Sequence, residues 1–236
     1  MAEPTGWSWI GTRLLGNQVI VYDRGVDYGE YKYNLFSQTL VKTGGNLYDP
    51  TTSADTWRFL IAFDGTVEYF DNASSREESY DSTRAEMGYF SSAHLPWSVT
   101  LEDYGVTGIG VGDGYNNTTA VLDKTIYGNE IWSLASYWRE FHGLPWFVPS
   151  IGEVQELYKQ KYYLPSLTAS LTQLNDRPDV GDPGADNTLG ICRIWSSTES
   201  TTDPANYAQI LNWRDGSITD YQKDLISARF TLCRYE

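Results

Sequence analysis

The residue types best suited to chemistry are scarce in this chain. It contains two histidines, His94 and His142, and two cysteines, Cys192 and Cys233. Two histidines do not supply a three-histidine metal site, and a Ser-His-Asp or Cys-His mechanism would depend on one of them. The cysteines lie 41 positions apart, with neither CxxC spacing nor a second pair, so the sequence predicts no zinc site.

Two states are open for the cysteines. A disulfide between Cys192 and Cys233 would close a long loop and, by the chain-entropy argument, would stabilise the fold by about 4 kcal/mol. Two buried free thiols are the alternative, because an unpaired cysteine packs as a small apolar residue.

A hard cation is the next ligand to weigh. Asp182, Asp186 and Asn187 lie in a Pro-, Gly- and Asp-rich stretch at 175–190. Oxygen-rich loops suit calcium, but neither EF-hand spacing nor a lectin-type Glu-Pro-Asn triplet occurs. The sequence therefore predicts no cofactor, with calcium binding in this stretch as an alternative to a solvated acidic loop.

Glycines alternate with other residues from 108 to 114, and Asn116-Asn117-Thr118 follows them. The spacing is not that of a dinucleotide fingerprint, and no Lys-Ser or Lys-Thr pair completes a phosphate loop. The pattern instead predicts a tight turn into a helix, with Asn117 or Thr118 as the N-cap.

The elements that would position such residues begin with strands. Gln18 to Asp23 and Trp57 to Phe63 are rich in β-branched and aromatic residues, which predicts two strands. Asp64-Gly65 then precedes another such run, Thr66 to Phe70, and this order predicts a hairpin. The rest of the first half is expected to form an N-terminal arm (1–17), short strands with long loops (24–56) and an exposed polar loop (72–88).

Helical patterns occupy the middle of the chain. Apolar residues recur at three- and four-residue steps within 129–142, and Gly143 is a C-terminal stop signal. Ser150 and Glu153 match a capping box before a second helix with Ile151, Val154, Leu157 and Tyr158 on its buried face. A third, shorter helix is expected at about 166–174.

Strand patterns return in the last third. We expect strands at 191–195, 207–213 and 217–221 and a closing segment at 226–234. A polar loop is expected at 196–206 and a turn at Asp215-Gly216. This order of strands, helices and an antiparallel C-terminal meander (191–236) predicts a single α+β domain over residues 1–236.

Composition excludes several classes of partner. The 236 residues include 17 basic and 31 acidic side chains, which gives a net charge of −14. Such a chain is a poor ligand for nucleic acid or an anionic membrane, because both require a basic face. No apolar run reaches 18 residues, so no direct membrane insertion is expected. No signal peptide is visible, and a surface-displayed, extracellular or virion-associated location is favoured.

Several motifs occur together in order along the chain. They are "TGIGVGDGYNNT", "GLPWFVPSIGEVQELY", "WSSTES", "AQILNWRDGS", Lys223 and "TLCR", preceded by "QVIVYDRG" and "WRFLIAF". Together, over about residues 15–236, they resemble the prokaryotic C-type-lectin-like domains of Lcl-type adhesins and of variable proteins of diversity-generating retroelements. The resemblance implies a C-type-lectin-like fold with two main helices against a twisted antiparallel sheet with long loops.

The same resemblance assigns structural roles to some motif residues. It implies that Ala208 packs inward, that Gly216 closes a hairpin and that Trp195-Ser196-Ser197 anchors a long loop. It implies that the approach to the second helix is set by Pro145, Trp146, Pro149 and Ser150. The chain departs from the family pattern at Pro145, where an Asp is expected, and in its last strand.

The superfamily also includes enzymes, among them the formylglycine-generating enzyme. Those oxidases use a cysteine pair close in sequence that binds copper, and iron-dependent relatives use a histidine cluster. Neither feature is matched here, since Cys192 and Cys233 are distant and only two histidines exist. We therefore expect a protein that is not an enzyme, with an oxidase as the least favoured alternative.

The last third of the chain has the composition of a binding surface. Tyr and Trp give large rigid contact areas, while Ser, Asn and Asp add adaptable hydrogen bonds. The predicted ligand-binding residues are Thr201, Asp203, Asn206, Tyr207, Gln209, Leu211, Trp213, Arg214, Asp215, Ser217, Thr219, Tyr221 and Gln222. The expected ligand is a protein or glycan on a cell or virus surface, and the oligomeric state is open.

Two kinds of binder fit this surface. Asn, Tyr, Ser, Asp, Thr, Arg and Leu all arise from one Asn codon by changes at adenine, so their density after Ser196 agrees with a hypervariable region of a diversity-generating retroelement. The alternative is a carbohydrate-binding adhesin domain of constant specificity, for which calcium dependence is left open.

Overall fold

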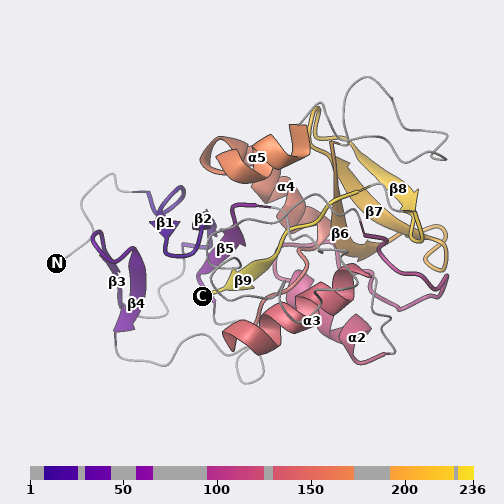
Figure 1. Ribbon diagram of the computed structural model, residues 1–236, viewed down its shortest axis with the longest axis horizontal. Coiled ribbons are helices and arrows are strands. Elements are labelled where there is room, and N and C mark those ends of the chain that lie inside the picture. The colour runs from indigo at the N-terminus through magenta and orange to yellow at the C-terminus, as the bar shows by residue number, and fades with distance from the viewer. Residues whose placement is uncertain are drawn as a thin grey trace, which may run out of the picture.

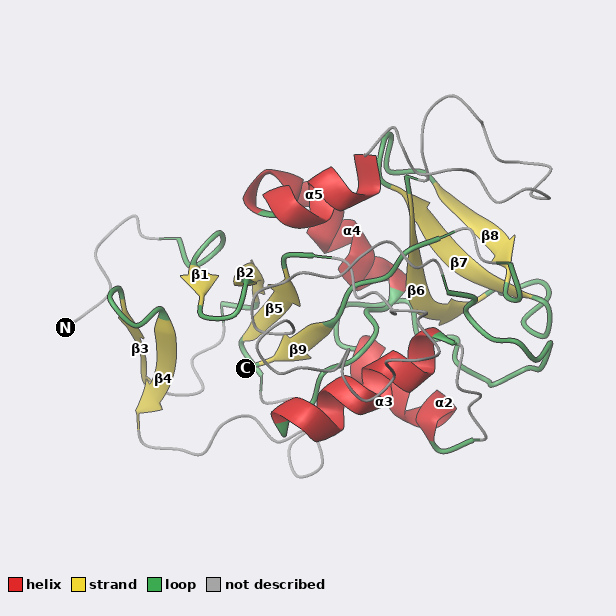
Figure 2. Cartoon of the chain, viewed as in Figure 1, coloured by secondary structure: helices red, strands yellow, loops and turns green. Residues whose placement is uncertain are grey.

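The computed structural model describes residues 8–25, 30–43, 57–65, 95–124, 130–172, 192–225 and 228–236. Three predictions lie outside these residues: the return strand at 66–70, the polar loop at 72–88 and the acidic stretch at 175–190. The calcium alternative at Asp182, Asp186 and Asn187 belongs to that stretch. Figures 1 and 2 show the described elements as two strand regions separated by helices.

The first sheet joins the two ends of the chain. Its strands are β1 (Arg13–Leu14), β2 (Gln18–Asp23), β5 (Phe59–Phe63) and β9 (Cys233–Tyr235), in the order β1-β2-β5-β9. All neighbours are antiparallel, and Ala62 of β5 pairs with Cys233 of β9. The predicted strand at 18–23 is confirmed, the one predicted at 57–63 begins at Phe59, and residues 233–235 complete their sheet.

Two further antiparallel sheets come from segments that lie between strands of the first sheet in sequence. β3 (Glu30–Asn34) and β4 (Thr39–Thr43) form a hairpin. β6 (Arg193–Glu199), β7 (Tyr207–Asn212) and β8 (Ile218–Gln222) form a three-stranded sheet in that order. Mixed helices and antiparallel sheets confirm the α+β class.

The helices follow one another in the middle of the chain. They are α2 (Gly114–Leu122), α3 (Ile131–His142), α4 (Ile151–Lys159), the short 3-10 helix η1 (Lys161–Tyr163) and α5 (Pro165–Thr172). α3 ends at Gly143, whose φ of 60° is the left-handed conformation that glycine adopts readily. α4 begins with the predicted capping box, in which Ser150 and Glu153 each bond to the other's backbone.

The start of α2 differs from the prediction. The helix begins at Gly114, with Asp113 as its N-cap, so Asn117 and Thr118 lie inside it and not at its cap. Asn117 donates from Nδ2 to the Gly108 carbonyl, and Thr118 Oγ1 donates to the Val148 carbonyl. These side chains join the buried side of the helix to neighbouring segments. Asn and Thr are common at N-caps, and the sequence pattern alone does not distinguish a cap from this buried role.

β6 is longer than the predicted strand at 191–195. It continues through Ser196 to Glu199, where a polar loop was expected, and all of these residues are buried. Their polar groups have partners inside the protein: Ser196 Oγ donates to the Gln209 carbonyl and Thr198 Oγ1 to the Gly108 carbonyl. Burial of polar strand residues is tolerated because each one is hydrogen-bonded.

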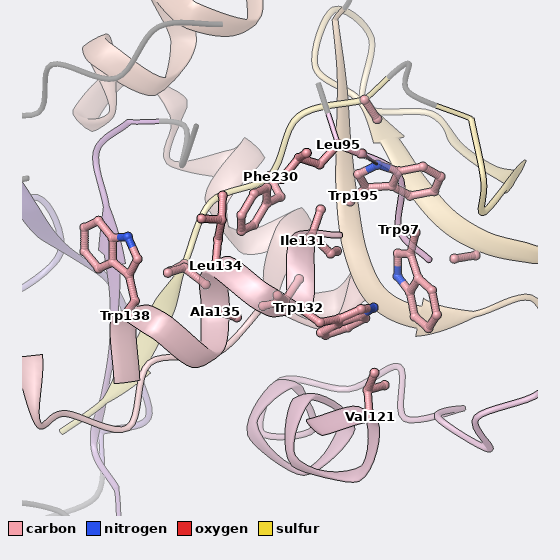
Figure 3. Packing of buried hydrophobic residues seen from close by; sticks show 14 of the residues in the cluster. Leu95, Trp97, Val121, Ile131, Trp132, Leu134, Ala135, Trp138, Trp195 and Phe230 are labelled. Carbon is pink, nitrogen blue, oxygen red and sulfur yellow. Dashed lines mark hydrogen bonds between the residues drawn. The ribbon is translucent and has the colours of Figure 1, made fainter. Parts of the chain in front are cut away.

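Two large clusters make up most of the core. One gathers around α3, where Trp97 and Trp132 meet edge to face with ring centroids 4.7 Å apart, and Trp195 and Phe230 close it (Figure 3). The other surrounds α4, whose Val154 and Leu157 pack with residues of β2, β5 and β7. α4 therefore lies between the first sheet and the β6-β7-β8 sheet, and it fixes one against the other.

Cys192 and Cys233 are both buried and form no disulfide with each other, so the disulfide alternative is wrong. Cys233 lies in β9, where burial and the nearby Glu153 carboxylate raise the pKa of its thiol well above the ordinary value. Cys192 lies just before β6, with its Sγ 3.6 Å from the Arg214 guanidinium. One thiol therefore lies in a strand of the first sheet and the other just before the β6-β7-β8 sheet.

Glu153 links α4 to the C-terminal strand. Its carboxylate accepts hydrogen bonds from the Tyr235 hydroxyl, from the Gly112 N–H at 3.0 Å and from the Ser150 N–H at 2.7 Å. Burial raises the pKa of Glu153 from 4.5 to about 7, although these hydrogen bonds oppose the rise. The folded protein therefore holds a proton on Glu153 at pH values where the unfolded chain has released it.

This difference predicts a pH dependence of stability. Between pH 4.5 and about 7 the folded state binds more protons at Glu153, so the free energy of unfolding falls as the pH rises through this window. The slope from one group reaches about 1.4 kcal/mol per pH unit. Urea denaturation of the protein and of Glu153→Gln should differ by this slope, and parallel pH profiles would contradict the assignment.

Candidate functional site

The β7–β8 hairpin carries most of the predicted ligand-binding residues. Its register is regular, from Tyr207 opposite Gln222 to Leu211 opposite Ile218. Gly216 closes the turn with φ of 77°, and a Cβ atom there would lie 2.6 Å from the Tyr158 ring. Only glycine combines this conformation with this close approach, so the turn is fixed against α4.

Eleven of the thirteen predicted residues are at least partly accessible, and two are not. Leu211 and Trp213 have relative exposures of 0% and 1%. Trp213 packs edge to face on Tyr158 and donates from Nε1 to Thr168 Oγ1 at 3.3 Å. Their assignment to the binding surface is therefore wrong: α4 and α5 cover this end of β7, and both side chains belong to the core.

The accessible residues form two groups at opposite ends of the hairpin. At one end lie Thr201, Asp203, Asn206, Tyr207 and Gln222, and at the other lie Arg214, Asp215 and Ser217. Gln209, Thr219 and Tyr221 lie between them. A five-residue strand spans about 16 Å, so a ligand that reaches both groups must be extended or large.

Some of these side chains shape the loops that carry them. Asn206 donates from Nδ2 to both carboxylate oxygens of Asp203 at 2.9 Å. Ser217 donates to Asp215 from its N–H and its hydroxyl, which lowers the pKa of Asp215. Both acidic groups keep their loops in one conformation, which favours binding because less entropy is lost on contact.

The two tyrosines lie on opposite faces of the sheet, because they occupy positions of opposite alternation in paired strands. Tyr221 leans toward the core: its ring meets Trp195 at 6.0 Å between centroids and lies under the Arg193 guanidinium at 4.6 Å. Tyr207, next to the loop at 200–206, is half-buried on the other face. Tyr207 is therefore the aromatic side chain better placed for a ligand.

Sequence reasoning missed two exposed residues of β8. Ile218 is 38% exposed, and Asp220 is exposed while accepting a hydrogen bond from Ser200 Oγ at 2.5 Å. The predicted set took Thr219, Tyr221 and Gln222 from this strand and left out these two residues. β8 is the terminal strand of its sheet, and Ile218, Thr219 and Asp220 are exposed on both of its faces.

A buried ion pair holds this region in place. Lys223 Nζ lies 2.5 Å from Glu199 Oε1 and also donates to the carbonyls of Pro204 and Glu102. It lies 4.5 Å from the centroid of the Trp97 ring. Burial lowers the pKa of Lys223, and Glu199 opposes that change. One ammonium group therefore fixes β6, the loop at 200–206 and the end of β8 together.

No group of three or more His, Cys, Asp or Glu side chains within the described ranges is arranged to hold a metal ion. Among the described helices, none is long and apolar enough to cross a membrane. Comparison of the sequence with protein-family models and with curated proteins gives no match.

Lys223→Met should be strongly destabilising, because it leaves the Glu199 carboxylate buried without its counter-ion. The expected loss is about 3–5 kcal/mol in the free energy of unfolding, measured in urea. Lys159→Met is the matched control, since Lys159 is 61% exposed and pairs with Glu156 on the surface. It should change stability by less than about 1 kcal/mol. Equal effects of the two substitutions would contradict a structural role for the buried pair.

Proposed function

We propose that this chain is a non-enzymatic ligand-binding protein with a C-type-lectin-like fold, and that the β7–β8 hairpin and the loop at 200–206 form its binding surface. The observation that carries the proposal is the contrast between this surface and its support. Aromatic and short polar side chains are accessible on these strands and turns. Other residues of the same strands are buried in the two large core clusters, which hold the strands in place. A rigid scaffold with variable, accessible loops is a common arrangement for recognition.

The sequence resemblance extends this proposal to a hypervariable protein of a diversity-generating retroelement. The residue types reachable from one Asn codon by adenine changes are dense after Ser196, and those at 201, 203, 206 and 207 are accessible. The buried residues of the same segment, such as Trp195 and Ala208, would be constant because they fill the core. The ligand would be a protein or glycan on a cell or virus surface.

Substitution at each end of the surface tests the binding role. Once a ligand is identified by screening glycan arrays and a library of cell-surface proteins, Tyr207→Ala and Arg214→Ala should each weaken binding by about tenfold. Tyr162→Ala and Lys159→Ala are matched controls, because both residues are exposed and belong to η1 and α4, outside the β7–β8 hairpin and the loop at 200–206. Full affinity in both surface variants, with normal thermal unfolding, would show that the surface is wrongly assigned.

Sequencing the gene region tests the retroelement proposal independently. A near-copy of the codons for about 190–234, differing only at adenines and lying beside a reverse transcriptase gene, is the expected result. Variation among sibling cells or particles should fall at accessible positions such as Tyr207 and spare buried ones such as Trp213. Identical siblings without such a repeat would leave a binder of constant specificity.

A further inference from the structure

β8 is the outer strand of the β6-β7-β8 sheet. Among the described residues, no strand pairs with its far side (Figure 2). β6, at the other side of the sheet, differs because Ile194 forms a parallel bridge to Arg229. The open edge is therefore on the strand that also carries the accessible residues of the proposed binding surface.

The hydrogen-bonding pattern identifies which backbone groups face outward. The Asn212 N–H donates to the Ser217 carbonyl, and the Lys223 N–H donates to the Asn206 carbonyl. Alternate residues of a strand direct their N–H and C=O groups to opposite sides, so 217, 219, 221 and 223 face β7. Ile218 and Asp220 consequently direct their N–H and C=O groups away from the sheet.

This edge lacks three of the usual protections against pairing, and its exposed charged side chain is Asp220. β8 contains no proline, its register with β7 has no bulge, and no lysine side chain is exposed on it. Ile218, Thr219 and Asp220 are all exposed. Natural proteins usually block such an edge with proline, lysine or a bulge, because an open edge pairs with other extended chains.

Charge indicates what kind of chain would pair there. Asp215, Asp220 and Asp224 are exposed in and next to this hairpin. Within the described segment 213–225, Arg214 is the exposed basic residue, because Lys223 is buried against Glu199. A second copy of this chain would bring a net charge of −14 against the same acidic strand, so self-pairing is opposed. An extended segment with lysine or arginine opposite Asp220 is complementary.

We propose that the β8 edge binds an extended, basic peptide segment of a partner protein by strand addition. The backbone groups of Ile218 and Asp220 supply main-chain hydrogen bonds, and Asp220 selects a basic side chain. This inference rests on the proposed function, because it names the ligand class for part of the same surface. It also accounts for the distance between the two groups of accessible residues, since an extended strand runs along β8 from one to the other.

The direct test uses a synthetic ten-residue peptide of alternating valine and lysine as the probe. Binding should slow hydrogen exchange at the Ile218 and Asp220 amides by at least about tenfold, as read by NMR of the full chain. The same peptide with alternate amides N-methylated, and a valine–glutamate version, should not protect them. Absence of protection by the lysine peptide, or equal protection by the glutamate peptide, would overturn the inference.

Asp220→Pro provides the matching variant. Its missing N–H faces away from β7, and proline is tolerated on edge strands at such positions. We expect about tenfold weaker probe binding with little change in thermal unfolding, whereas Asp220→Asn keeps the N–H and should lose only the preference for lysine over glutamate. If Asp220→Pro does not fold, Asp220→Asn and the exchange measurement still decide the question. An Asp220→Asn protein that still prefers the lysine peptide over the glutamate peptide to the same extent overturns the inference.

The two proposals fail in different ways. A ligand that is lost in Tyr207→Ala but leaves the Ile218 and Asp220 amides exchanging freely overturns strand addition and retains the binding surface. A probe that protects both amides while Tyr207→Ala and Arg214→Ala keep full affinity for the identified ligand retains strand addition and overturns the wider surface.

Discussion

The buried ion pair between Glu199 and Lys223 is the interaction on which the recognition region depends. Glu199 accepts the N–H groups of Tyr104 and Val106, while Lys223 reaches the carbonyls of Glu102 and Pro204. Segments far apart in sequence, near 104 and near 204, thus converge on one pair of charges. Two charges removed from water need hydrogen-bond partners as well as each other. The backbone N–H and carbonyl groups that serve as these partners must therefore keep their positions, which fixes the loops that contain them.

That constraint explains how polar residues make up a buried strand. Ser196, Ser197, Thr198 and Glu199 are inaccessible, and their side chains replace apolar packing with hydrogen bonds to segments near 108, 151 and 209. Such networks specify one arrangement, because a shift of any strand leaves a polar group without its partner. The core around α3 supplies apolar burial, and the network beside it supplies the register.

Local signals in the sequence predicted local structure well. The capping box at Ser150, the stop at Gly143 and the strand at 18–23 each depend on a few neighbouring residues, and the structure confirms them. The burial of Trp213 and the length of β6 depend on distant partners, α4 and the 108 segment, so the local pattern indicated surface and loop instead. Accessible positions such as Thr201 and Asp215 were identifiable from their polar, turn-forming context, whereas the open edge of β8 follows only from strand order.

The position of β9 in the first sheet has a consequence for biosynthesis. β5 lies between β2 and β9, and Cys233 also pairs with Phe147, so residues 233–235 complete a sheet that residue 13 begins. Until residues 233–235 have emerged from the ribosome, β5 lacks one neighbour and Glu153 lacks the Tyr235 hydroxyl. β1, β2 and β5 therefore remain an incomplete sheet while the helices and the β6-β7-β8 sheet are being synthesised. Contacts of such long sequence separation form slowly, so closure of the first sheet by β9 is expected to be a late step of folding.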